Sequence, residues 1–192
     1  MLDTYGKIDG LVNAAGGIFH EGTIEDNDDI LNLNINGLKK VMDLNLWGTV
    51  LPTQIFGEAI IRNGEGVIVN ISSLAAKRVI SGIMGYGLAK SAVEYFTKCI
   101  AVELSRKHGD TIRINAIVPG FFAADQSTKL LSGTKKAIEK HDTEILKRTP
   151  FKRLGGCDEL NGTLIWLLSS ASKFVTGTTV IVDGGFNINS GI

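Results

Sequence analysis

The sequence predicts an α/β protein with a doubly wound parallel sheet, for three reasons. The chain has 192 residues, which is enough for one domain with a sizeable core. Short apolar runs rich in branched residues alternate with longer stretches of helical apolar spacing. Near-continuous hydrophobicity is typical of strands buried on both faces, and helices between such strands cover both sides of the sheet. Ligands bind such sheets beyond the carboxyl ends of the strands.

Four strands and three helices alternate along the chain. The predicted strands are Ile8–Asn13, Gly66–Ile71, Ile112–Val118 and Thr178–Val182. The predicted helices are Leu38–Arg62, Tyr86–Lys107 and Asp158–Ser169. Pro52 and two glycines predict that the first helix is bent or interrupted. The second helix places Ala89, Val93, Phe96, Ile100 and Leu104 on one stripe, which predicts the face that packs on the sheet.

Residues 121–156 interrupt this alternation between the third strand and the last helix. They hold no strong strand, contain two short helical stretches and carry several lysines and arginines. An insertion at this place is typical of a lid over a site rather than of a separate domain. Its positive charge is typical of a solvated helix face.

Charge and composition exclude several classes of function. Lys and Arg number 20 and so do Asp and Glu, so the formal net charge is zero and no nucleic-acid partner is predicted. No apolar run approaches the roughly 20 residues of a membrane span, and the first residues lack a secretory signal pattern. Two distant cysteines and three scattered histidines predict neither a disulfide framework nor a metal site. We therefore expect a cytoplasmic protein with a small-molecule partner.

Ser73, Tyr86 and Lys90 form the strongest candidate for chemistry. Tyr86 and Lys90 are four residues apart at the start of a helix and therefore share a face. An ammonium near a phenol favours the phenolate, so we expect Lys90 to lower the pKa of Tyr86 from about 10. Ser73 follows the strand Gly66–Ile71 and is placed to hydrogen-bond the substrate oxygen that Tyr86 protonates. By itself, the Tyr–Lys spacing is much more typical of a surface helix pair.

Six motifs span the chain from end to end. They are VNAAG at Val12–Gly16, DLN at Asp43–Asn45, ISS at Ile71–Ser73, YGLAK at Tyr86–Lys90, IRINAIVPG at Ile112–Gly120 and VTGTTVIVDGG at Val175–Gly185. In their order and in the 13-residue step from Ser73 to Tyr86, the chain resembles the short-chain dehydrogenase/reductase family. The resemblance implies a Rossmann-like fold, NAD or NADP as cofactor, hydride transfer, and a homodimer or homotetramer.

The resemblance also implies which residues do the work. The implied catalytic tetrad is Asn45, Ser73, Tyr86 and Lys90, with Lys90 also holding the nicotinamide ribose and Asn45 supporting a proton-relaying water. The implied cofactor-binding residues are Ala14, Ala15, Gly16, Ile71, Tyr86, Lys90, Pro119, Gly120 and Phe122. Two positions depart from the family: Ala14 replaces a common Asn, and Ala124 replaces a Thr that often holds the carboxamide. Both departures weaken the side-chain contacts implied there.

No glycine-rich turn of the GxxxGxG or GxGxxG kind follows a strand. The family places this turn near its N-terminus, where a helix start seats the pyrophosphate. By resemblance, residues 1–192 are one partial domain that begins just before the family's fourth strand, without the residue that selects NAD or NADP. We then expect Ile8–Asn13 to be an uncovered apolar edge that promotes aggregation, and we do not expect full activity from this chain alone.

The substrate is predicted from fewer residues. Arg78 lies in the loop between Ser73 and Tyr86, where a guanidinium can grip a carboxylate, although a solvent-facing arginine explains it as well. LPTQ at Leu51–Gln54 and PGFFAADQ at Pro119–Gln126 resemble the D-mannonate oxidoreductase, or fructuronate reductase, branch of the family. This implies a sugar acid such as D-fructuronate or D-mannonate, contacted by Ser73, Arg78, Tyr86 and Gln126.

Three alternatives remain open at this point. In the first alternative the enzyme activity is the same, but the substrate is a 3-oxoacyl carrier protein, a polyol or a gluconate. In a second alternative the chain is a non-catalytic fragment that associates through the helices Leu38–Arg62 and Tyr86–Lys107, which form the dimer interface in the family. A flavodoxin-like binding module shares the strand–helix alternation but gives no reason for the spacing of Ser73, Tyr86 and Lys90.

Overall fold

Four parallel strands form one sheet in the order β1-β2-β3-β4. The computed structural model describes residues 2–25, 28–123 and 143–190. The strands are β1 (Gly10–Asn13), β2 (Gly66–Ile71), β3 (Ile112–Pro119) and β4 (Thr179–Val182). Each begins and ends within two residues of its predicted counterpart, so the predicted parallel sheet is confirmed.

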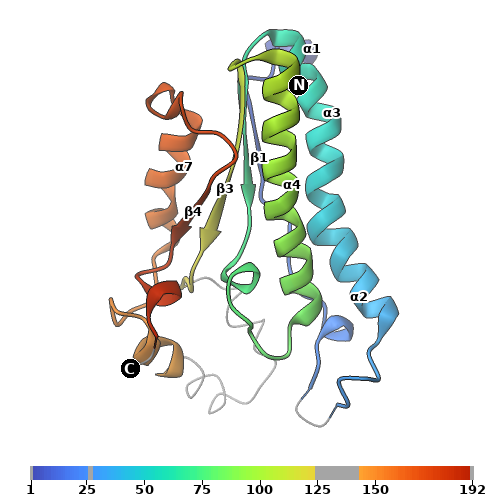
Figure 1. Cartoon of the computed structure of the whole chain (residues 1–192), viewed down its shortest axis with the longest axis vertical. Coiled ribbons are helices and arrows are strands. Elements are labelled where there is room, and N and C mark those ends of the chain that lie inside the picture. Colours follow the sequence, from blue (N-terminus) through green and yellow to red (C-terminus); the bar gives the residue numbers. More distant parts are fainter. Residues whose placement is uncertain (1, 26–27, 124–142, 191–192) are drawn as a thin grey trace.

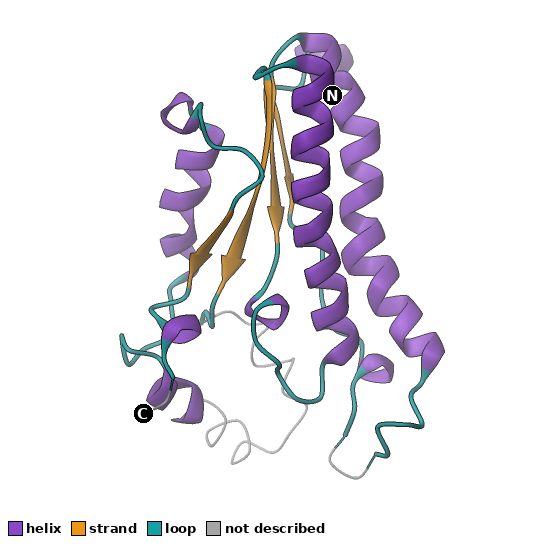
Figure 2. Cartoon of the chain, viewed as in Figure 1, coloured by secondary structure: helices purple, strands orange, loops and turns teal. Residues whose placement is uncertain are grey.

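Helices cover both faces of the sheet, as Figures 1 and 2 show. The α-helices are α1 (Leu2–Tyr5), α2 (Ile35–Met42), α3 (Gly48–Asn63), α4 (Met84–His108) and α7 (Asn161–Leu168). Short 3-10 turns lie at His20–Gly22, Leu74–Ala76, Cys157–Leu160, Ser170–Ser172 and Phe186–Ile188. In Figure 1, α7 lies on one side of the strands, and α3 and α4 lie on the other. The doubly wound α/β class is therefore confirmed.

Strand β2 shows why its apolar run is continuous. Ile68 packs in the cluster shared with Ile60 of α3 and Ala101 of α4. Val67 and Val69 pack in a second cluster, shared with Leu167 of α7. Successive side chains of a strand point to opposite faces, so a strand with helices on both sides is apolar on both faces, and the one polar side chain of β2, Asn70, is hydrogen-bonded.

The predicted interruption of the first long helix is confirmed, but its position differs. Residues Asp43–Trp47 form a π-helical turn between α2 and α3, whereas α3 continues through Pro52. The buried Asn45 lies in this turn and donates a side-chain hydrogen bond to the Val41 carbonyl at 2.9 Å. Widened turns of this kind are frequent at functional sites. The turn therefore marks Asn45 as a residue held in a special position.

Four hydrogen-bonded polar side chains, two of them from paired asparagines, form a polar row that runs from α3 across the sheet to α4. Asn13 and Asn70 are register partners on β1 and β2, and the Asn13 amide donates to Asn70 Oδ1 at 2.8 Å. Asn13 also donates to Thr53 of α3, and Asn70 donates to Thr97 of α4, both at 2.9 Å. All four side chains are buried. Since buried polar groups are costly unless they are hydrogen-bonded, this row fixes how α3 and α4 sit on the sheet.

In the described sheet, β1 is an edge strand that pairs with β2 alone. Its Val12 side chain is exposed. Open edges favour pairing with another strand. The expected aggregation through this edge stays a prediction. Among the described residues, no helix is long and apolar enough to cross a membrane.

Candidate active site

Ser73 and Tyr86 come together where the end of β2 meets the start of α4. Ser73 caps the turn Leu74–Ala76, since its hydroxyl accepts a hydrogen bond from the Ala75 amide at 3.2 Å. This turn packs tightly on α4, because a Cβ on Gly87 would lie 3.0 Å from the Ala75 carbonyl oxygen. The glycine beside Tyr86 therefore allows the helix to approach the serine loop.

The Tyr86 phenol is shaped by burial and by Ser73. Burial raises the pKa of Tyr86, and a hydrogen bond from the Ser73 side chain opposes this by lowering it. The expected lowering of the Tyr86 pKa by Lys90 is thus wrong for this structure. Lys90 Nζ lies over the ring face, 5.6 Å from the ring centroid. At neutral pH Tyr86 is therefore a protonated phenol, which is the form that can donate a proton.

The Lys90 ammonium is buried beside the end of β2. Its Nζ donates a hydrogen bond to the Ile71 carbonyl at 2.9 Å, and only 3% of the residue is exposed. Burial lowers the pKa of Lys90 to about 8, because a charged group loses solvation inside the protein. An ammonium has three hydrogens to donate. Lys90 can therefore hold a further oxygen while it stays bonded to Ile71.

Asn45 and Lys90 converge on Gly16. The Asn45 amide donates to the Gly17 carbonyl at 2.7 Å and accepts from the Gly17 amide at 3.1 Å. A Cβ on Gly16 would lie 2.8 Å from Asn45 Oδ1 and 3.0 Å from Lys90 Nζ. The loop after β1 is thus fastened to the π-helical turn, and only glycine leaves room between the amide and the ammonium.

The structure brings Asn45, Ser73, Tyr86 and Lys90 into one region through these contacts. Ala14 and Ala15 follow β1 and are exposed next to Gly16. Ile71 joins the group through its carbonyl. The predicted cofactor-binding residues therefore begin at the carboxyl ends of β1 and β2.

Pro119, Gly120 and Phe122 lie at the end of β3, on the other side of β2 from Gly16. Gly120 donates to the Val182 carbonyl at 2.8 Å, and a Cβ on it would lie 2.6 Å from Asp183 Cα. Phe122 forms an isolated parallel bridge with Gly155. The backbone at Gly120 is thus held close to the end of β4, which also needs a residue without a side chain.

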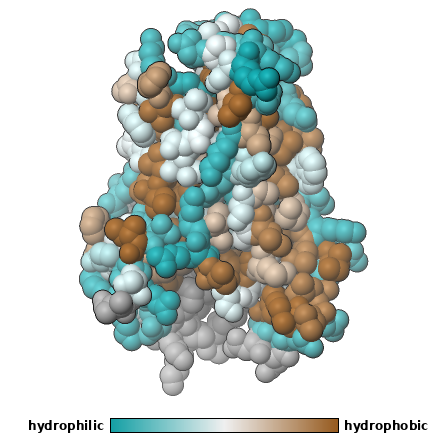
Figure 3. Space-filling view, viewed as in Figure 1, coloured by the Kyte–Doolittle hydropathy of each residue, from teal (hydrophilic) through white to brown (hydrophobic). Residues whose placement is uncertain are grey.

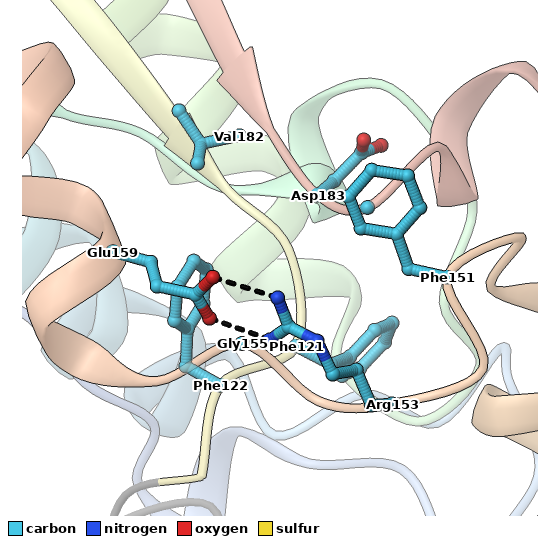
Figure 4. Close-up of a pocket in the computed structure, with 9 residues that line it drawn as sticks. Phe121, Phe122, Phe151, Arg153, Gly155, Glu159, Val182 and Asp183 are labelled. Carbon is cyan, nitrogen blue, oxygen red and sulfur yellow. Dashed lines mark hydrogen bonds and ion pairs between the residues drawn. The ribbon is translucent and has the colours of Figure 1, made fainter.

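A cavity of about 160 Å³ adjoins this end of the sheet (Figure 4). It is lined by Phe121, Phe122, Phe151, Arg153, Gly155, Glu159, Val182, Asp183 and Gly184. Arg153 and Glu159 face each other through two hydrogen bonds of 2.6 and 2.7 Å, which lower the pKa of Glu159 to about 2. Of the predicted catalytic and cofactor-binding residues, Phe122 lines this cavity, whereas Ser73, Tyr86 and Lys90 do not.

Arg78 has a partner of its own. Its guanidinium donates to the side chain and the backbone carbonyl of Asn187, which lies in the turn Phe186–Ile188. Arg78 is exposed, and its hydrogen bonds go to Asn187 rather than to Ser73 or Tyr86. Gln126 lies outside the described residues, as does much of the expected lid. Residues 143–148 of that segment are helical.

Three residues beside the site were not singled out from the sequence. Ser72 is buried and donates to Glu94 Oε1 at 3.0 Å, and Lys77 bonds the other oxygen of Glu94 at 2.5 Å. The available signal was a carboxylate one turn beyond Lys90 and beside the apolar stripe of the same helix. In the described ranges, no group of three or more His, Cys, Asp or Glu side chains gathers as metal ligands would.

Comparison with known proteins agrees with this geometry. A family model described as enoyl-(acyl carrier protein) reductase matches residues 1–187. The uncharacterized oxidoreductase UxuB of Bacillus subtilis is 34% identical over 202 residues, which cover 100% of this chain and 71% of that protein.

Solved structures match as well. A Haemophilus influenza structure with bound NAD, provisionally named a D-mannonate oxidoreductase, has a TM-score of 0.86 and 35% identity, covering 100% of this chain and 71% of that one. A gluconate 5-dehydrogenase from Burkholderia cenocepacia in complex with NADP and tartrate has a TM-score of 0.82 and 31% identity, covering 97% and 68%.

The parallel sheet and these relatives together define an oxidoreductase of the Rossmann-like α/β class. The chain belongs to the short-chain dehydrogenase/reductase family, a family of NAD(P)-dependent enzymes.

Proposed function

We propose that the full-length protein transfers hydride between a nicotinamide cofactor and the carbonyl or secondary alcohol of a sugar acid of the D-fructuronate or D-mannonate type. The observation that carries this proposal is the convergence of Asn45, Ser73, Tyr86 and Lys90 at the carboxyl ends of β1 and β2. In doubly wound sheets this edge is where ligands bind.

Each residue of the tetrad has a role that its contacts support. Ser73 donates a hydrogen bond to the substrate oxygen and orients it. Tyr86 donates its phenolic proton to that oxygen during reduction, and its raised pKa keeps the proton available at neutral pH. Lys90 places a positive charge over the Tyr86 ring and keeps hydrogens to donate to the cofactor ribose. Asn45 holds the loop at Gly17 and supports a water that returns protons.

The residues present fit the nicotinamide ribose. Gly16 leaves open the space that a side chain would fill between Asn45 and Lys90, and Lys90 keeps hydrogens to donate to a ribose hydroxyl. Ala14, Ala15, Ile71, Pro119, Gly120 and Phe122 complete the proposed cofactor contacts. When bound, nicotinamide supplies or accepts the hydride. Relatives were solved with NAD and with NADP, and both stay open for this chain.

The proposed substrate class is supported by the relatives and by the Arg78 guanidinium. The matched proteins include a 2-dehydro-3-deoxy-D-gluconate 5-dehydrogenase from Dickeya dadantii, 35% identical over 187 residues that cover 95% of this chain and 66% of that protein. Arg78 lies on the loop after Ser73, and its exposed guanidinium, which donates to Asn187, would bind a substrate carboxylate by exchanging this partner. Gln126 is the proposed partner of the sugar hydroxyls, and residues 121–156 are the proposed lid.

A substrate comparison tests this proposal. The full-length protein is assayed with NADH and NADPH against D-fructuronate and against neutral ketoses, and Arg78→Ala is compared with Arg106→Ala on the exposed end of α4. We expect Arg78→Ala to raise KM for the sugar acid much more than for a neutral ketone. Equal effects on both substrates would instead favour a 3-oxoacyl or polyol substrate, and no reduction of any carbonyl would refute the proposed activity.

Association through α3 and α4 is also part of the proposal. Apolar side chains gather over these helices in Figure 3, and Leu51, Ile55, Leu88, Tyr95 and Val102 are exposed. Large exposed apolar faces mark interaction sites. We propose that they join copies of the chain into a homodimer or homotetramer, in the cytoplasm.

A further inference from the structure

A buried polar contact lies directly behind the proposed catalytic serine. Ser72, the residue before Ser73, is 2% exposed, and its hydroxyl donates to Glu94 Oε1 at 3.0 Å. The same hydroxyl lies 3.4 Å from the Lys90 carbonyl oxygen. Glu94 follows Lys90 by one turn of α4 and is 5% exposed. The serine loop is thus bonded to the helix at the level of Lys90.

Lys77 joins Ser72 and Glu94 in one cluster, which it approaches from the other side of the serine loop. Its Nζ lies 2.5 Å from Glu94 Oε2 and 3.5 Å from the Thr179 hydroxyl at the start of β4. Lys77 follows the turn Leu74–Ala76, so the cluster grips the loop both before and after Ser73. Glu94 therefore ties both ends of this loop to α4.

The Lys77–Glu94 ion pair is more buried than the other ion pairs between described residues. The Lys77 and Glu94 side chains are 23% and 7% exposed, whereas the other ion pairs between described residues join side chains that are at least 43% exposed. Burying a carboxylate is costly unless it is paired and hydrogen-bonded, and such pairs contribute more to a fixed geometry than to stability. A plain apolar contact would hold α4 on the sheet equally well.

We propose that Ser72, Lys77 and Glu94 are positioning residues that fix Ser73 against the Tyr86 phenol and Lys90. The proposal rests on the proposed function for its catalytic consequence, but the geometry it describes is measurable without turnover. The Ser73 side chain hydrogen-bonds the Tyr86 phenol, and this hydrogen bond lowers the pKa of the phenol. If the cluster holds Ser73 in place, weakening the cluster weakens that hydrogen bond.

Titration of the Tyr86 phenol tests this directly. Tyrosinate absorbance is followed against pH in each variant, and the Tyr86→Phe trace is subtracted to remove the other tyrosines. We expect Ser72→Ala and Glu94→Gln each to raise the pKa of Tyr86 by about 0.5, the size of a weakened hydrogen bond. In Ser73→Ala the hydrogen bond is already absent, so adding Glu94→Gln should raise the pKa no further.

A purely electrostatic role predicts the opposite direction. Glu94→Gln removes a negative charge and leaves Lys77 uncompensated, which would lower the pKa of a nearby phenol. A lowered or unchanged pKa in both Ser72→Ala and Glu94→Gln therefore overturns the proposal. Glu103→Gln, in an exposed pair on the same helix, is the matched control and should leave the titration unchanged.

Kinetics separates this proposal from the proposed function. In the full-length enzyme we expect Glu94→Gln to lower kcat by up to about 100-fold with cofactor affinity unchanged, since small misplacements of catalytic groups are costly. If the unmodified enzyme reduces no carbonyl, the proposed function fails, while the phenol titration still decides the positioning role. If Glu94→Gln does not fold, Ser72→Ala carries the same prediction.

Discussion

Lys90 Nζ lies 5.6 Å from the centroid of the Tyr86 ring and donates to the Ile71 carbonyl at 2.9 Å. The cation therefore faces the ring and the strand end at once. Burial disfavours the charge of this ammonium and lowers the pKa of Lys90 to about 8. The lowered pKa gives the protein a measurable dependence on pH.

Lys90→Met should change how stability depends on pH. Between a folded pKa of about 8 and the ordinary value of 10.5, the unfolded chain keeps the Lys90 proton while the folded chain loses it. The free energy of unfolding contributed by this group therefore rises with pH across that window. Urea unfolding from pH 7 to 10 should show the wild-type gaining stability relative to Lys90→Met. A difference that does not vary with pH would contradict the buried ammonium.

Gly16→Ala tests the space between Asn45 and Lys90. The added Cβ would lie 2.8 Å from Asn45 Oδ1 and 3.0 Å from Lys90 Nζ, so one of these groups must move. Overpacking of this kind typically costs 1–3 kcal/mol, so we expect kcat/KM and dinucleotide affinity to fall by about tenfold. Gly17→Ala is the control, because its Cβ would meet only Leu44 at 3.6 Å. Equal effects of the two variants would contradict the assigned site.

Asn70→Ala should destabilise the fold strongly. It leaves the buried Asn13 amide and the Thr97 hydroxyl each without their Asn70 partner. An unsatisfied buried polar group costs about 1–3 kcal/mol, so we expect a loss of about 2 kcal/mol or more in urea unfolding. Asn32→Ala, at an exposed position, should change stability little. A loss below about 0.5 kcal/mol for Asn70→Ala would refute the role of the polar row.

Ile55→Glu should disrupt association through α3 and α4. Ile55 is 65% exposed on α3, and a carboxylate buried in a self-complementary interface meets its own copy. Light scattering should show a smaller species than the wild-type. Val79→Glu, at a fully exposed loop position, should leave the mass unchanged. An unchanged mass for Ile55→Glu would place the interface elsewhere.

The strands and most helices follow from the sequence because apolar periodicity is a local signal. Gly66–Ile71 is apolar at every position except Asn70 because helices cover both faces of the sheet, and this pattern is visible in the sequence. The helix interruption was expected from Pro52 and two glycines, but α3 accommodates Pro52 and the backbone widens at Asp43–Trp47, just before Gly48. The Asn45 contact with Gly17 spans 28 positions, so a local sequence pattern does not reveal it.

The candidate site, too, was predicted in part from the sequence and missed in part. The family motifs predicted Ser73, Tyr86 and Lys90 at one strand end. The direction of the Tyr86 pKa was mispredicted, because helical spacing gives the distance along α4 but neither the burial of the phenol nor the position of the ammonium over the ring face. Glu94 was missed because a carboxylate on a helix is usually solvated, and its partners Ser72 and Lys77 lie 22 and 17 positions away.

The most direct test of the whole account is hydride transfer by Tyr86→Phe in the full-length protein, measured as NAD(P)H consumption with a sugar-acid ketone. Tyr95→Phe, at an exposed position on the same helix, is the control. The account predicts that Tyr86→Phe lowers kcat by about 100-fold or more while Tyr95→Phe keeps wild-type activity, since the phenol proton is the acid of the reaction. A Tyr86→Phe enzyme within tenfold of the wild-type would contradict it.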